Sequence, residues 1–209
     1  MDVTIGKFRI SGAALVALSA VYFFDFTGLF FPVLAAVAIH ELGHLIALYF
    51  LRYKIAEFRI DLWGLTIRYN KTMSYAHELI SAAAGPAASF ALAVAASFYG
   101  RAAASDSAYI LAGISLVCGA FNLLPVLKLD GGRMLYDVAA LMFSLDAAEK
   151  LITVTSCAVI GALLTAGAAV LIWTRVNFTL LLAAAWLLIS YCKKSGLRIK
   201  SRGKKVGCV

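Results

Sequence analysis

The stretch AIHELGHL, residues 38–45, lies within an apolar run that extends from Phe31 to Leu51. A helix of about 20 largely apolar residues is long enough to cross the hydrocarbon core of a bilayer, so the run predicts a membrane-spanning helix. The interior of this helix nevertheless carries the ionisable side chains of His40, Glu41 and His44. Because ionisable groups are costly in lipid, they usually mark a functional site.

The remainder of the chain is also too apolar for an ordinary soluble domain. The 209 residues are 63% hydrophobic and only 14% charged. Apolar runs fall at residues 10–31, 31–51, 75–99, 108–127, 151–173 and 177–191. We therefore predict an all-α polytopic membrane protein with about six transmembrane helices. In this interpretation residues 1–192 form a single transmembrane domain and residues 193–209 a basic cytoplasmic tail.

Two segments between the predicted spans have patterns of their own. Between the second and third spans, Ile55, Phe58 and Ile60 partly alternate with polar residues ahead of Gly64. This alternation predicts a short β-hairpin at the membrane surface. Residues 134–149 mix apolar and acidic positions at helical spacing, which predicts an amphipathic helix at the interface.

The distribution of basic residues predicts the orientation in the membrane. If six helices place both termini in the cytoplasm, every Lys and Arg except Arg101 and Arg175 lies on the cytoplasmic side. Cytoplasmic loops of membrane proteins are enriched in Lys and Arg, so this split favours cytoplasmic N- and C-termini. The net charge of +8 is therefore explained by the bilayer, whose anionic lipids attract the tail, and no nucleic-acid partner is expected.

His40 and His44 have the spacing of two metal ligands on one helix. Four residues are about one helical turn, so both imidazoles project from the same face about 6 Å apart along the axis and suit one zinc ion. Glu41 follows the first histidine directly. Its carboxylate can accept a proton from a water molecule at the metal as that water attacks a carbonyl, and can pass the proton to the leaving amine. The alternative is that these polar side chains only tie helices together.

Zinc needs a third protein ligand, and Asp130 is the best candidate. It ends the stretch FNLLPVLKLD, residues 121–130, and two glycines follow it. Pro125 and the glycine pair allow backbone outside regular helix at the end of the fourth span. The second and fourth spans run in the same direction, so His44 and Asp130 can meet in the cytoplasmic half of the membrane. In the alternative interpretation, Asp-Gly-Gly is an ordinary turn.

Residues outside the metal set are candidates for contact with a substrate. The side-chain amide of Asn122 can hydrogen-bond a substrate backbone or a neighbouring loop. Gly85 and Pro86 interrupt the third span, where a kink can serve helix packing or expose backbone groups to an extended substrate. His77 is instead expected to mark the membrane interface, and Asp25 to lie near the outer surface.

Three features of this chain together resemble the motifs of the site-2 protease family of intramembrane metalloproteases. They are HELGH in one span, Gly-Pro in a later one, and NLLP followed by LDGGR. The resemblance covers residues 31–133, the expected catalytic core. It implies one zinc ion bound by His40, His44 and Asp130, with Glu41 as the general base. Members of this family cleave membrane-tethered regulators such as transcription factors, sigma factors and anti-sigma factors.

The compact chain is similar to one branch of that family. We expect no PDZ-like domain, because none is inserted between the motifs, and no CBS pair, because the segment after Tyr191 is too short for one. The chain then resembles the bacterial branch that includes the sporulation protease of a late sigma-factor precursor. Ser89 stands three residues after Gly-Pro, where the family usually has Asn.

The expected function is that of a zinc metalloprotease of a bacterial cell membrane, with its active site toward the cytoplasmic half. Its expected partners are a membrane-tethered protein substrate, the lipid bilayer and regulatory membrane proteins. Two alternatives stay open. One is a catalytically silent membrane scaffold of the same fold, and the other is a metal transporter that uses the same His and Asp residues.

Overall fold

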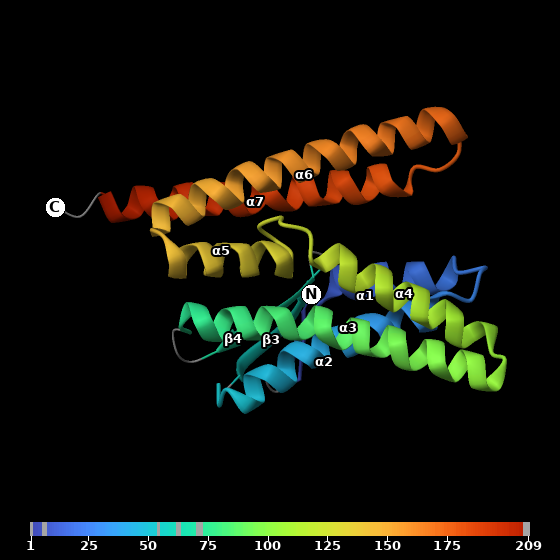
Figure 1. The fold of residues 1–209 in the computed structure, drawn as a ribbon. Coiled ribbons are helices and arrows are strands. Elements are labelled where there is room, and N and C mark those ends of the chain that lie inside the picture. Colours follow the sequence, from blue (N-terminus) through green and yellow to red (C-terminus); the bar gives the residue numbers. More distant parts are fainter. Residues whose placement is uncertain (1, 6–7, 54, 62–63, 70–72, 207–209) are drawn as a thin grey trace. The chain divides into compact units, whose positions relative to one another are not determined.

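The computed structural model describes residues 2–5, 8–53, 55–61, 64–69 and 73–206. The chain forms two compact units, Met1–Asn122 and Leu123–Val209. The N-terminal unit contains strands β1 to β4 and helices α1 to α4, and the C-terminal unit contains helices α5 to α7 (Figure 1).

The helices of the N-terminal unit are α1 (Gly12–Phe23), α2 (Phe30–Phe50), α3 (Tyr75–Ala103) and α4 (Asp106–Asn122). Helices α2, α3 and α4 each pack against the other two. Small side chains are buried among them, including Ala36, Ala82 and Ala96. Small residues let membrane helices approach closely. At Gly43 the approach of α3 is so close that a Cβ atom would collide with the carbonyl oxygen of Ala84.

A four-stranded sheet belongs to the same unit, in the order β1 (Asp2–Ile5), β2 (Phe8–Ser11), β3 (Ile55–Asp61) and β4 (Gly64–Tyr69). Strands β3 and β4 pair antiparallel in the segment where the hairpin is predicted, and β2 pairs with β3 in parallel. The location of this hairpin at the membrane surface stays a prediction.

The prediction for the first span is wrong at its start. Ile10, its predicted first residue, lies in β2, and α1 begins at Gly12. The all-α description with a single hairpin therefore omits two strands. The physical reason is that an isolated hairpin leaves an edge of unpaired N–H and C=O groups, and β2 pairs with that edge on β3.

The C-terminal unit consists of α5 (Asp130–Met142), α6 (Leu145–Thr174) and α7 (Thr179–Val206). Helix α6 packs against both other helices and runs beside α7 (Figure 1). The interfacial helix predicted over residues 134–149 is divided between α5 and α6. The division falls at Ser144, whose side chain accepts the backbone N–H of Ala147 and caps the start of α6.

Three of the described helices, α2, α3 and α6, are long and apolar enough to cross a membrane. Helix α4 and the first part of α7, Thr179–Cys192, are apolar but shorter, and α1 has 12 residues. The count of six spans therefore stays a prediction. The fourth span is predicted to reach Leu127, but α4 ends at Asn122. Pro125 explains the difference, because proline disfavours helical backbone in the residue before it.

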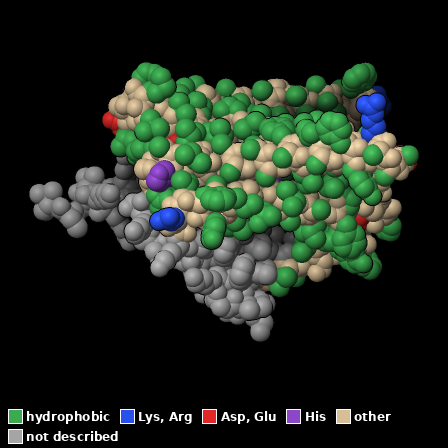
Figure 2. Space-filling view, turned by 60° about the horizontal axis from the view of Figure 1, so that its bottom comes forward, with side chains coloured by type: hydrophobic (Ala, Val, Ile, Leu, Met, Phe, Trp, Pro, Cys, Tyr) green, Lys and Arg blue, Asp and Glu red, His purple; other side chains and the backbone are tan. Residues whose placement is uncertain are grey.

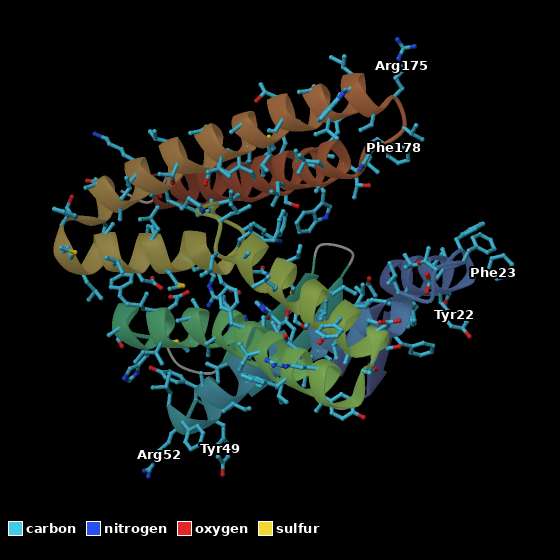
Figure 3. All side chains as sticks on the ribbon, turned by 45° about the vertical axis from the view of Figure 1, so that its right-hand side comes forward. Tyr22, Phe23, Tyr49, Arg52, Arg175 and Phe178 are labelled. Atoms are coloured by element: carbon cyan, nitrogen blue, oxygen red, sulfur yellow. The ribbon has the colours of Figure 1, made fainter. Side chains whose placement is uncertain are left out.

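The surface has the character expected in lipid. Hydrophobic side chains are spread along the described face in Figure 2. Many large apolar side chains are exposed, which is unusual for a soluble monomer. Aromatic and basic side chains project from helix ends and turns in Figure 3. The labelled examples, all exposed, are Tyr22, Phe23, Tyr49, Arg52, Arg175 and Phe178. Since aromatic residues gather at membrane–water interfaces, these positions support a membrane setting for each unit.

Candidate metal centre

His40 and His44 form a pair on one face of α2. Both are buried, and their rings lie 5.0 Å apart between centroids at an interplanar angle of 81°. The two Nε2 atoms are 3.3 Å apart. Two nitrogen ligands of a tetrahedral zinc ion, each about 2.0–2.1 Å from the metal, are separated by about 3.3–3.4 Å. The pair therefore has the spacing that one zinc ion requires.

The Nδ1 atoms of both histidines are held by α3. His44 Nδ1 lies 2.7 Å from the carbonyl oxygen of Ser81, and His40 Nδ1 lies 2.8 Å from Ser89 Oγ. A carbonyl oxygen only accepts, so His44 carries its proton on Nδ1 and presents the Nε2 lone pair. Partners of this kind fix the tautomer and the ring orientation of metal-binding histidines.

Gly85 lies between these two partners on α3, directly against the histidine rings. A Cβ atom at Gly85 would collide with Nε2 and Cε1 of His44 and would lie 2.9 Å from Nε2 of His40. Ser81, Gly85 and Ser89 follow one another at intervals of four residues, so they share one face of the helix. Glycine at the centre of this face leaves room for the imidazoles.

Helix α3 continues through Gly85 and Pro86, and the kink at these residues stays a prediction. Both residues are buried. Contact with a substrate stays a prediction for them, and the contact that the structure gives Gly85 is with the metal-binding rings.

Glu41 follows His40 on α2 and is less buried than either histidine. Successive helical residues point in directions about 100° apart, so its carboxylate leaves the helix beside the histidine pair and not between the two rings. This placement suits a group that acts on a water molecule next to a metal.

Asp130, in the C-terminal unit, is the first residue of α5 and is buried. Its carboxylate therefore lies in the first helical turn, where the helix dipole favours a negative charge. One carboxylate oxygen is 3.6 Å from Nη1 of Arg133. The prediction that Asp130 lies late in the fourth span is wrong, since seven residues without regular helix separate it from Asn122.

The start of α5 is packed tightly against the loop before it. A Cβ atom at Gly131 would collide with the carbonyl oxygen of Leu123, and one at Gly132 with that of Val126. The loop is held in turn by α6, because the backbone N–H of Leu127 donates to Ser156 Oγ at 2.9 Å. The glycine pair that follows Asp130 thus lets the helix begin directly against the loop.

The other predicted residues have partners of their own. The Asn122 side-chain amide donates to the carbonyl oxygen of Cys118 at 3.0 Å, so one of its contacts is within α4. Its proposed contact with a substrate stays a prediction. His77 Nδ1 is 3.0 Å from the Tyr53 hydroxyl, away from the histidine pair. Asp25 precedes α2, where its carboxylate accepts the backbone N–H of Phe30 at 2.7 Å.

Sequence reasoning missed how α3 supports the histidines. The notable residues are Ser81 and Ser89, of which the first acts through its backbone carbonyl. The available signal was the four-residue spacing of Ser81, Gly85 and Ser89, which repeats the spacing of His40 and His44. Two helices with small or polar residues at the same spacing can face one another along that stripe.

The chain matches a protein-family model, and its fold is similar to that of a solved structure. Residues 99–165 match the model of Peptidase family M50, and this segment includes Asn122 and Asp130 but not the histidine pair. The chain has no match among curated proteins. Its structure is similar to the Site-2 Protease from Methanocaldococcus jannaschii, with a TM-score of 0.68, 21% sequence identity, and coverage of 93% of this chain and 94% of that chain.

Proposed function

We infer from the Peptidase family M50 match and the shared fold that this chain is a member of the site-2 protease family. We propose that it is a zinc-dependent intramembrane protease that hydrolyses peptide bonds of membrane-associated proteins. The observation that carries the proposal is the buried histidine pair on an apolar helix, with Nε2 atoms 3.3 Å apart and both Nδ1 atoms held by α3.

The proposed zinc ligands are His40, His44 and Asp130. Each is buried and offers one ligand atom, and two imidazoles with one carboxylate are an established donor set for catalytic zinc. Three protein ligands leave one position open. When bound there, zinc would polarise the peptide carbonyl and lower the pKa of a water molecule.

Glu41 is proposed as the general base. Its carboxylate accepts a proton as water attacks the carbonyl carbon, and the same carboxyl group then donates that proton to the departing amine nitrogen, so the carboxylate is regenerated. Ser89 and the Ser81 carbonyl keep the two imidazoles oriented during the cycle.

The membrane setting restricts the substrate. Peptide groups inside a helix are hydrogen-bonded to one another, so a spanning substrate has to unwind locally before its backbone can reach Glu41. We propose a membrane-tethered regulator as the substrate, such as a sigma-factor precursor, cleaved in the cytoplasmic half of a bacterial cell membrane. The predicted concentration of basic residues on the cytoplasmic side supports this orientation.

The test uses the full chain in proteoliposomes with a library of single-span peptides, and the cut products are identified by mass spectrometry. Glu41→Gln should lower the rate of cleavage by about 100-fold to 10,000-fold, the usual contribution of a general base. Zinc content should stay at the wild-type level. Glu149→Gln on α6 is the matched control and should cleave normally.

Unchanged cleavage by Glu41→Gln would remove Glu41 from the mechanism. Metal flux into the liposomes without any cut peptide would favour the transporter, and the absence of both cleavage and flux would favour the scaffold.

A further inference from the structure

A groove lies between α3 and α4, at the end of the N-terminal unit where these two helices are joined. Its volume is about 460 Å³, within the range of small-molecule sites. The residues that matter for its chemistry are Ala93, Ser97 and Arg101 from α3, and Tyr109, Ala112 and Gly113 from α4.

The lining of the groove combines small residues with the larger apolar side chains of Val94, Phe98 and Leu116. Ala93 and Ala112 are buried. A Cβ atom at Gly113 would meet no other atom within 4 Å, so no neighbouring side chain fills the space above it. At the end near the turn, the Tyr109 ring packs against Gly100. A Cβ atom added to Gly100 would lie 3.3 Å from atoms of that ring.

Arg101 gives this apolar groove a positive charge at one end. It lies in the last turn of α3 and is exposed. Within the described part of the chain, its guanidinium has neither a hydrogen bond nor an ion pair. Asp106, in the first turn of α4, does not line the groove. The planar guanidinium carries its N–H donors in a fixed fork that can bind two phosphate oxygens at once.

We propose that this groove binds one anionic phospholipid from the leaflet around the α3–α4 turn. An acyl chain lies along the small side chains, and the phosphate binds Arg101 beside Tyr109. The groove from Ala93 to Arg101 extends over nine helical residues, a rise of about 12 Å along the helix axis. A single guanidinium at one end of an otherwise apolar groove complements a molecule that joins an anionic headgroup to an acyl chain, which favours a lipid as the occupant. The proposal is independent of proteolysis.

Native mass spectrometry of the full chain, released from detergent with phosphatidylglycerol and phosphatidylcholine of the same acyl composition, tests this site. The wild type should retain one phosphatidylglycerol in preference to phosphatidylcholine by about fivefold, the factor expected for one basic residue near anionic lipid. Arg101→Gln should bind the two lipids equally. Gly113→Leu should lose the adduct of both lipids, because the side chain fills the groove. Arg175→Gln, at the α6–α7 turn, is the matched control and should behave as wild type.

The proposal fails if Arg101→Gln still retains phosphatidylglycerol in preference to phosphatidylcholine. It fails too if Arg175→Gln reduces that preference as much as Arg101→Gln does, since any basic residue at the surface would then have the same effect. It also fails if the adduct persists in Gly113→Leu, which would mean that the lipid binds elsewhere. A photoreactive residue in place of Leu116, an exposed large side chain that already lines the groove, should capture lipid in native membranes. Capture of a polypeptide instead would identify the groove as a helix-docking site. Circular dichroism checks that each variant is folded.

Discussion

The histidine pair and Asp130 are positioned by different physical means. In the N-terminal unit, His40 and His44 are oriented by hydrogen bonds from Nδ1 to Ser89 and to the Ser81 carbonyl. In the C-terminal unit, Asp130 begins a helix whose glycines pack directly on a neighbouring backbone. A side chain that hydrogen-bonds a histidine can be removed while its helix stays intact. A side chain added where a glycine touches the backbone of a neighbouring segment forces that backbone to move. Substitutions should therefore disturb the second arrangement more.

Gly131→Ala should have the largest effect on metal binding. The new Cβ atom would collide with the carbonyl oxygen of Leu123, and because that oxygen belongs to the backbone, the start of α5 has to shift. Misplacement of a functional group by about 1 Å can cost about 100-fold, and we expect a loss of zinc affinity of that size. Competition with a chelator measures it. Gly161→Ala on α6, where a Cβ atom meets nothing within 4 Å, should bind zinc as the wild type does.

Gly85→Ala should come next, because its new Cβ atom collides with imidazole atoms and side chains can rotate. The expected loss of zinc affinity is about 10-fold to 100-fold, measured by the same competition. Gly113→Ala on α4 is the control with open space at the Cβ position. If Gly85→Ala affected zinc more than Gly131→Ala, the proposed ranking of the two regions would be reversed.

Ser89→Ala should have a smaller effect, a loss of zinc affinity of about 10-fold, since it removes one partner of a metal-binding histidine. Ser89→Thr keeps the hydroxyl group and should restore most of the affinity. Ser115→Ala is the control, because that buried hydroxyl donates to Leu111 of its own helix. Equal affinities for Ser89→Ala and wild type would mean that this hydrogen bond does not orient His40.

Asp25→Asn should have the smallest effect and should change stability without changing zinc affinity. The Phe30 N–H, followed by the Thr27 hydroxyl, lowers the pKa of Asp25 below its ordinary 3.8. A group with a lowered pKa stabilises the fold at neutral pH, and this contribution is lost as the pH falls through the folded-state pKa. The melting temperature of the variant should lie below that of wild type at neutral pH, and the gap should close in acid. A gap that persists in acid would exclude the charge of Asp25 as its cause.

The sequence predicted the pairing of the histidines well, because helical spacing alone brings residues four apart onto one face. It also predicted backbone outside regular helix near Asp130, and residues 123–129 form no regular helix. The start of α5 could not be predicted, because Pro125 and the glycines permit several conformations and the choice depends on contacts with Leu123 and Val126.

The sheet and the supporting role of α3 were harder to predict for a related reason. Strand β2 pairs with β3, a segment more than forty residues away, and β1 pairs in turn with β2, and local patterns do not report such distant partners. In the sequence alone, Ser89 stands out only as a replacement for the Asn that the site-2 protease family usually has there. Its contact with His40 depends on how closely α3 approaches α2, which Gly43 and Gly85 allow.

We propose that one zinc ion is bound jointly by His40, His44 and Asp130. The most direct measurement is an anomalous-difference map, collected at the zinc absorption edge, from crystals of the full chain grown with zinc. We expect one peak about 2.0–2.2 Å from both Nε2 atoms and from an Asp130 carboxylate oxygen. A peak bound by the histidines with Asp130 remote from it would contradict the account.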